Sequence, residues 1–179
     1  SLPPFWKVML LSDGSVTRHL HLATGVAATV EVLGMGRVAG GSTLPPPLPP
    51  GAELLAEPLL QRRVLLKHGT TGQPLVYAVS WWNEEAAAAA VGAKPDAPIW
   101  TSLAASRTEL FRDIRSVTLG GCPALEAMLL GRVEGGSDPR STPPLFWGRH
   151  YIFWRGGRPL TVIYEAFSPA LAEYLGPCA

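Results

Sequence analysis

The sequence has few cysteines, few lysines and no long hydrophobic run. Its two cysteines, Cys122 and Cys178, form neither a CxxC pair nor a disulfide framework, so a reducing compartment is the simplest setting. No run of about 18 apolar residues occurs, so we expect no transmembrane helix. Fifteen basic residues nearly balance fourteen acidic ones. The net charge of +1 therefore provides no general attraction to nucleic acid or to anionic lipid.

The composition is otherwise that of a folded chain. Hydrophobic residues make up 47% of the 179 positions and charged residues 16%, so we predict a single domain spanning residues 1–179 with a sizeable core. Glycine and proline are concentrated in stretches that we interpret as loop insertions, at residues 34–50, 83–96 and 133–144, although the alanine-rich second stretch is either a low-complexity insertion or a short surface helix. All but three basic residues are arginine, which suits carboxylate or phosphate binding, although codon bias explains the excess equally well.

Local patterns predict short helices and antiparallel hairpins. Ser15 or Asp13 would cap a helix that Gly25 ends, and Gly156-Gly157 suits a tight turn between two strands. We predict helix over residues 5–22, 99–106, 123–130 and 168–176, strand over residues 26–33, 61–68, 74–82, 150–155 and 159–167, and either state over residues 109–117. Adjacent hairpins outnumber long helices, so the fold class is α+β with a largely antiparallel sheet.

Two charged residues fall on apolar strand faces. Arg62 alternates with Val64 and Leu66, whereas the other face of that strand carries more polar residues and is interpreted as solvent-facing. A buried cation is costly, so Arg62 either meets an anion, from the protein or a ligand, or reaches water at the strand end. Glu165 interrupts the apolar segment TVIYEAF. Its carboxyl group must be paired, hydrogen-bonded or neutral, and a structural ion pair and a ligand site both remain open.

Other candidates are less distinctive. Arg149 could hold an acid, or it could belong to an ordinary loop-to-strand junction. The charge-rich residues 107–113 are more typical of a solvated face with ion pairs. His19 and His21 are two residues apart, which is poor spacing for a metal on a helix. No GxGxxG, Walker-type or GxSxG motif is present. We therefore expect no cofactor and no metal, and chemistry carried by arginine and glutamate on a small anion.

Seven segments occur in an order that resembles chorismate pyruvate-lyase, in its cyanobacterial and plastid branch. They cover most of the chain outside the three insertions. In this sequence they read LLSDGSVTRHL from residue 10, PLLQRRVLL from 58, LVYAVSWW from 75, API-W from 97, SRTELFRDI from 106, FWGRHYIFWRGGRPL from 146 and VIYEAFSPAL from 162.

The resemblance implies a fold and a reaction. The fold is a six-stranded, mainly antiparallel sheet with helical flaps over an internal cavity. The reaction converts chorismate to 4-hydroxybenzoate and pyruvate without cofactor or metal, and supplies prenylquinone synthesis. Arg62 matches the residue that binds the ring carboxylate and Glu165 the one near the 4-hydroxyl group, while Val16 and Ile99 match pocket positions. Arg149 is our candidate for the second carboxylate of this dianion.

Two alternatives to catalysis use the same fold. One is a non-catalytic module that binds or senses a small aromatic acid, and the other is a structural subunit of a plastid or cyanobacterial assembly. The chain begins with Ser1, which suggests a processed product. We expect a nucleus-encoded protein of the plastid stroma, or else a cyanobacterial cytoplasmic protein.

Overall fold

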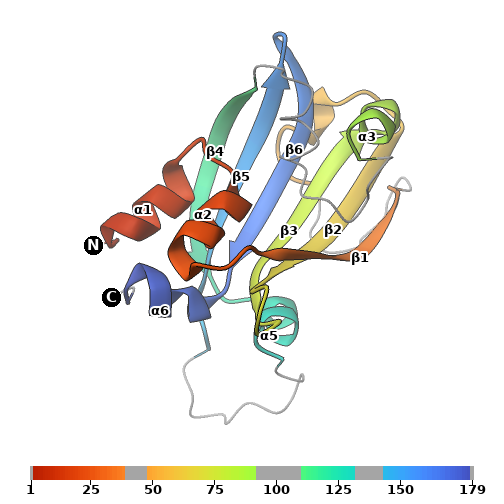
Figure 1. The fold of residues 1–179 in the computed structure, drawn as a ribbon. Coiled ribbons are helices and arrows are strands. Elements are labelled where there is room, and N and C mark those ends of the chain that lie inside the picture. Colours follow the sequence, from red (N-terminus) through yellow and green to blue (C-terminus); the bar gives the residue numbers. More distant parts are fainter. Residues whose placement is uncertain (1, 39–47, 92–109, 132–142, 178–179) are drawn as a thin grey trace.

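Six strands form one fully antiparallel sheet, in the order β1-β2-β3-β6-β5-β4 (Figure 1). This computed structural model describes residues 2–38, 48–91, 110–131 and 143–177. The strands are β1 (Thr29–Arg37), β2 (Leu59–Lys67), β3 (Pro74–Asn83), β4 (Phe111–Gly120), β5 (Phe146–Arg155) and β6 (Arg158–Phe167). The predicted fold class and the six-stranded antiparallel sheet are thus confirmed.

Short helices cover the sheet on both faces. The α-helices are α1 (Pro4–Leu11), α2 (Val16–Thr24), α3 (Glu84–Val91), α5 (Pro123–Leu130) and α6 (Ala172–Leu175), and two 3-10 turns span Ala52–Leu54 and Pro169–Leu171. Ser15 caps α2 as predicted, because its side chain accepts a hydrogen bond from the Arg18 amide, and Gly25 ends the helix with a φ of 73°. The predicted start of α5 at a proline is also confirmed.

Tight turns bring sequential strands into register. Gly156 and Gly157, with φ values of 55° and 74°, join β5 to β6 as predicted, because a two-residue turn of this hand needs positive φ at both positions. Cross-strand pairing then sets Arg149 on β5 opposite Glu165 on β6. Strand β6 pairs along its other edge with β3, which sets Ala78 opposite Glu165.

Each face of the sheet carries its own hydrophobic cluster. Helices α1, α2 and α6 pack on one face, which we call the cavity face, around apolar residues that include Trp6, Leu20 and Phe167. Helix α5 covers the opposite face through Leu125 and Leu129. The prediction that this second face of β2 meets solvent is wrong for two of its residues: Gln61 is 9% exposed and Leu65 is 6% exposed, and Leu65 belongs to the same apolar cluster as Leu125 and Leu129 of α5.

Several segments differ from their predicted boundaries, and the helix predicted over residues 5–22 is two helices, α1 and α2. Strand β1 continues past Gly34 to Arg37 with an irregular register after Val32, so the predicted break at residue 34 is wrong. Strand β5 starts at Phe146, so Arg149 lies within a strand and not at a junction. Residues 84–91 form α3, which agrees with the surface-helix alternative for this stretch, and the ambiguous residues 109–117 belong largely to strand β4. The predicted helix over residues 99–106 lies outside the described residues.

An ion pair joins the end of β1 to the start of α3. Arg37, at the end of β1, forms a bidentate pair with Glu84 at the start of α3, with N–O distances of 2.9 and 2.8 Å.

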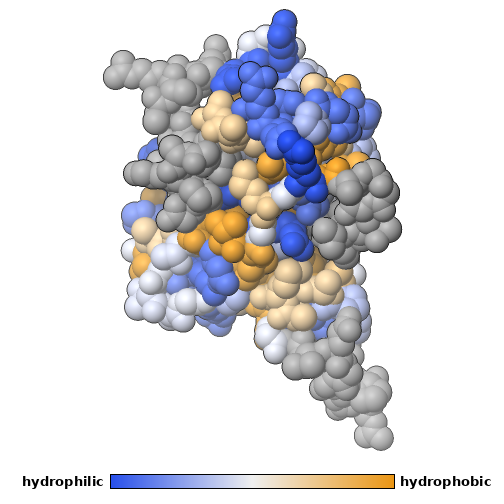
Figure 2. Space-filling view, turned by 90° about the vertical axis from the view of Figure 1, so that its right-hand side faces the viewer, coloured by the Kyte–Doolittle hydropathy of each residue, from blue (hydrophilic) through white to orange (hydrophobic). Residues whose placement is uncertain are grey.

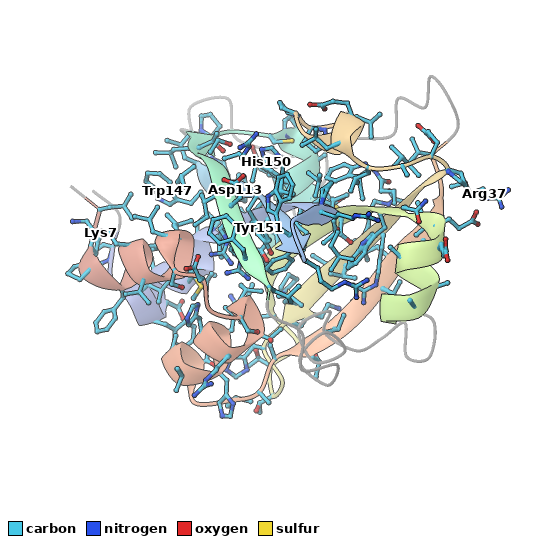
Figure 3. The ribbon with its side chains drawn as sticks, turned by 90° about the horizontal axis from the view of Figure 1, so that it is seen from above. Lys7, Arg37, Asp113, Trp147, His150 and Tyr151 are labelled. Atoms are coloured by element: carbon cyan, nitrogen blue, oxygen red, sulfur yellow. The ribbon has the colours of Figure 1, made fainter. Side chains whose placement is uncertain are left out.

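Seen from above, Tyr151 lies in the middle of the molecule, between α1 and the end that carries Arg37 (Figure 3). From the β1 side, apolar residues cross the middle of the surface, with hydrophilic residues above them (Figure 2).

Candidate functional site

A cavity lies between the cavity face of the sheet and the start of α2. It has a volume of about 60 Å³ and is partly open to solvent. Most of its wall is apolar, and its polar groups come from several different elements. The lining residues are Ser15, Val16, Thr17, Val30, Arg62, Val64, Leu66, Ala78, Ser80, Arg112, Tyr151, Phe153, Ile163 and Glu165.

Arg62 points into this cavity from β2. Its side chain shares the cavity wall with Val64 and Leu66, as the alternation of the strand predicts, and only 2% of the residue is exposed. Ser80 on β3 is its cross-strand neighbour and contributes a hydroxyl group to the same wall. The predicted position of Arg62 on an inward face is therefore confirmed, and Ser80 is a polar lining residue that the sequence analysis missed.

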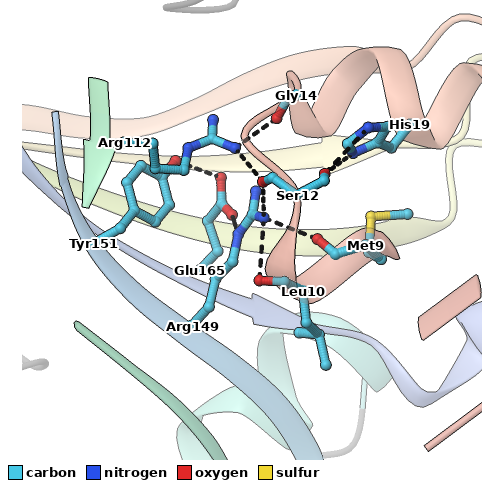
Figure 4. A network of polar contacts seen from close by, with 9 residues as sticks. All are labelled: Met9, Leu10, Ser12, Gly14, His19, Arg112, Arg149, Tyr151 and Glu165. Carbon is cyan, nitrogen blue, oxygen red and sulfur yellow. Dashed lines mark hydrogen bonds and ion pairs between the residues drawn. The ribbon is translucent and has the colours of Figure 1, made fainter. Parts of the chain in front are cut away.

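Glu165 lies in the same cavity and is also paired within the protein. It is 2% exposed. The Arg149 Nε donates a hydrogen bond to Glu165 Oε2 at 2.5 Å, and the Tyr151 hydroxyl donates to Glu165 Oε1 at 3.0 Å (Figure 4). The structural ion pair is therefore present, and because the carboxylate also lines a cavity, the ligand-site alternative stays a prediction.

Arg149 binds the Glu165 carboxylate but does not itself line the cavity. The residue is fully buried, and its Nη1 donates to the Met9 carbonyl oxygen at 2.8 Å and to those of Leu10 and Ser12 at 3.5 Å. Burial opposes the charge of Arg149, but Glu165 and Tyr151 outweigh that effect and raise its pKa. Arg149 is therefore a charged group that links β5 and Glu165 to the end of α1.

Tyr151 is held in its neutral form. Burial, and then the nearby carboxylate of Glu165, raise the pKa of the Tyr151 hydroxyl group. A neutral phenol donates one hydrogen bond, and here that bond goes to Glu165. Two fixed donors thus orient the Glu165 carboxylate before any ligand arrives.

Arg112 is a second cavity-lining arginine, and the sequence analysis did not single it out. It is 5% exposed, although residues 107–113 were interpreted as a solvated face, so that interpretation is wrong for Arg112. The expected ion pair does exist nearby, between Asp113 and Arg115 at 2.9 Å. The signal that was available is the one that identified Arg62, because Arg112 alternates with apolar Leu110 and Ile114.

The remaining predicted site residues are Val16 and Ile99. Val16 lines the cavity at the first turn of α2, beside the capping residue Ser15. Ile99 lies outside the described residues. Within the described part of the chain, no group of three or more His, Cys, Asp or Glu side chains is arranged to hold a metal ion. No helix there is long and apolar enough to span a membrane.

Comparison with known protein families shows which family the chain belongs to. A family model described as "Chorismate pyruvate-lyase Rv2949c-like" matches residues 10–175. The chain belongs to this chorismate pyruvate-lyase-like family. Relatives carry the description "Uncharacterized protein ycf21": one from Porphyra purpurea is 30% identical over 97% of this chain and 86% of its own length. Another, from Cyanophora paradoxa, is 29% identical over 93% of this chain and 78% of its own length.

Solved structures share the fold of this family member at low sequence identity. The SA0254 gene product of Staphylococcus aureus superposes with a TM-score of 0.61 and 17% identity, over 88% of this chain and 90% of its own. The effector domain of PhnF from Mycobacterium smegmatis also gives 0.61, with 15% identity over 90% and 92% of the two chains. The fold therefore occurs both in a lyase-like family and in a domain described as an effector domain.

Proposed function

We propose that this protein is a chorismate lyase that converts chorismate to 4-hydroxybenzoate and pyruvate. The observation that carries the proposal is the meeting of Arg62 and Glu165, from β2 and β6, in one mostly apolar cavity. Membership of the chorismate pyruvate-lyase-like family supports the same reaction. A mostly apolar cavity with a few convergent polar groups is the usual form of a small-molecule site.

Arg62 binds the ring carboxylate of the substrate in this proposal. Its planar guanidinium group can donate two parallel hydrogen bonds to one carboxylate, and the surrounding apolar wall strengthens that contact. Val16, at the first turn of α2, packs against the bound ring. Ile99 is proposed to complete the pocket, as the family resemblance implies.

Glu165 acts on the part of the ring that reacts. The C3–O bond breaks, the C4 hydrogen leaves as a proton, and the ring becomes aromatic, while the released enolpyruvate takes up a proton to give pyruvate. Arg149 and Tyr151 hold the Glu165 carboxylate in place, so it can accept a hydrogen bond from the 4-hydroxyl group or take up a proton. Positioning the carboxylate against the reacting atoms can contribute up to about 7–11 kcal/mol to the barrier reduction.

The decisive experiment is turnover of chorismate by the purified chain. We expect pyruvate and 4-hydroxybenzoate in equal amounts. Arg62→Gln should raise KM about tenfold or more, equivalent to about 1.4 kcal/mol, and Glu165→Gln should lower kcat more than it changes KM. Arg63→Gln, which changes the adjacent arginine on the other face of β2, is the matched control. Wild-type kinetics in a folded Arg62→Gln variant would remove Arg62 from the site.

A binding module is the second candidate, favoured by the structural similarity to the PhnF effector domain. Saturable binding of 4-hydroxybenzoate without any product from chorismate would establish this candidate in place of the lyase. For the lyase, we propose that 4-hydroxybenzoate supplies prenylquinone synthesis. We also propose a location in the plastid stroma, because the relatives come from algae, with a cyanobacterial cytoplasm as the alternative.

A further inference from the structure

We propose that Arg112 binds a second carboxylate and makes the cavity selective for dicarboxylates over monocarboxylates. This inference rests on the proposed function, because it assigns Arg112 to the enolpyruvyl carboxylate of chorismate. The product 4-hydroxybenzoate has only the ring carboxylate, so Arg112 would bind the substrate and not this product. The role expected from the sequence for Arg149 thus passes to a residue that lines the cavity.

The position of Arg112 is set by two aromatic rings and one loop. Its guanidinium carbon lies 4.6 Å from the ring centroid of Tyr151 and 4.8 Å from that of Phe153. Its Nη1 donates to the carbonyl oxygens of Ser12 and Gly14, at 3.0 and 2.5 Å, in the loop between α1 and α2. Stacking and these two hydrogen bonds hold the guanidinium plane in one orientation at the cavity wall.

The charge of Arg112 has no carboxylate partner among the residues that the structure describes. Its acceptors there are neutral carbonyl groups, and its buried Nε has no hydrogen-bond partner within that part of the chain. Asp113, the next residue on β4, is paired with Arg115. Glu165 is already paired with Arg149. Neither carboxylate is therefore available to neutralise Arg112.

A ligand carboxylate would supply the missing acceptor. Burying a guanidinium group without an anion is costly. An anion at this wall would accept a charge-assisted hydrogen bond from Arg112 and would reduce that cost. Arg62 and Arg112 reach the cavity from β2 and β4, strands on opposite sides of the central β3-β6 pair. A ring carboxylate and a second carboxylate on a side chain of the same ring match such a pair, whereas a single carboxylate engages one of them.

The test compares two stable ring acids that differ in one group. The dicarboxylate probe is 3-(carboxymethoxy)-4-hydroxybenzoate, and the monocarboxylate probe is 3-ethoxy-4-hydroxybenzoate, which has the same ring and a side chain of similar size. Calorimetry on the wild-type chain should show the dicarboxylate binding at least about tenfold more tightly. In Arg112→Gln the ratio of the two Kd values should fall below about threefold, while the Kd of the monocarboxylate stays within about threefold of wild type.

Arg115→Gln is the matched control, because it removes an exposed arginine from the same strand. It should retain the wild-type ratio. Retention of the ratio in Arg112→Gln would overturn the inference, as would equal weakening of both probes, which would show that Arg112 only holds the α1–α2 loop. If Arg112→Gln does not fold, Arg112→Lys keeps the charge without the planar fork; it should lower the ratio by weakening the dicarboxylate alone, and an unchanged ratio would overturn the inference.

Chorismate turnover separates this inference from the proposed function. A wild-type chain that prefers the dicarboxylate probe but releases no pyruvate would retain the role of Arg112 and exclude the lyase. A chain that releases pyruvate, with the same KM for chorismate in wild type and Arg112→Gln, would retain the lyase and exclude the role of Arg112. A wild-type chain with no preference between the probes would also overturn the inference.

Discussion

At Glu165, one carboxylate is held by two donors from the neighbouring strand. Arg149 and Tyr151 both lie on β5, and both side chains are almost completely buried. Replacing such a pair by apolar residues can be nearly neutral, but removing one partner leaves the other charge buried without compensation. The energetic importance of Arg149 therefore depends on whether Glu165 remains charged beside it.

Arg149→Met should consequently lower the free energy of unfolding by about 3–5 kcal/mol. The variant strands the Glu165 carboxylate and also frees the carbonyl groups at the end of α1. Urea unfolding monitored by circular dichroism measures the change. Arg115→Met is the control, because its exposed pair with Asp113 contributes only about 0–1 kcal/mol.

A partial recovery in the double variant Arg149→Met/Glu165→Gln would attribute the loss to the stranded charge. A neutral amide still accepts the Tyr151 hydrogen bond but no longer needs a cation. If the double variant were as unstable as the single one, the lost contacts to α1 would account for the effect. A single variant that lost less than about 1 kcal/mol would contradict the prediction itself.

At the scale of single elements, the packing of the turn between β2 and β3 depends on a glycine. Its residues follow His68, whose ring Nδ1 accepts hydrogen bonds from the Thr70 and Thr71 amides at 3.3 Å. A side-chain carbon at Gly69 would overlap the backbone carbonyl oxygen of Ala27, which precedes β1. Glycine at this position therefore lets the turn approach the segment between α2 and β1.

Gly69→Ala should lower the free energy of unfolding by about 1–3 kcal/mol, the usual range for overpacking. Gly36→Ala is the matched control on β1, because nothing lies within 4 Å of the added carbon. That change should be neutral or stabilise the protein by up to about 1 kcal/mol, since alanine restricts the unfolded chain more than glycine does. Thermal and urea unfolding give both values, and equal effects of the two changes would contradict the proposed contact.

On the scale of the whole molecule, the two ends of the chain build one cover over the cavity face. Helices α1 and α2 come from the beginning of the chain and α6 from its end, and they lie together beside the sheet in Figure 1. The Trp6 Nε1 donates to the Gly176 carbonyl oxygen at 2.8 Å across this cover. Arg112 and Arg149 connect the cover to β4 and β5 through the carbonyl groups of α1 and its loop.

A ligand in the cavity should therefore stabilise the sheet and the cover together. At a concentration of 4-hydroxybenzoate about 100 times its Kd, we expect about 2.7 kcal/mol of added stability. Hydrogen exchange should slow in α2, whose first turn lines the cavity, and much less in α5 on the opposite face. Neutral 4-hydroxybenzamide is the control ligand and should do neither. Ligand-induced protection confined to α5 would place the binding site elsewhere.

The sequence by itself determined the features that depend on neighbouring residues. Alternation along β2 placed Arg62 inward, the glycine pair between β5 and β6 set the turn, and Ser15 and Gly25 set the ends of α2. These features follow from local geometry, because strand side chains alternate with a period of two and because turns and helix ends need particular backbone angles.

Tertiary structure decided which distant groups meet. The pairing of Arg149 with Glu165 follows from strand register, and burial of Leu65 on the second face of β2 follows from the apolar cluster that it shares with α5. Arg112 lines the cavity because β4 lies beside β5 and the α1–α2 loop closes over it. Local alternation along β4 contains part of this information for Arg112, which shares a face with Leu110 and Ile114, but the covering of a strand face depends on contacts between segments far apart in the chain.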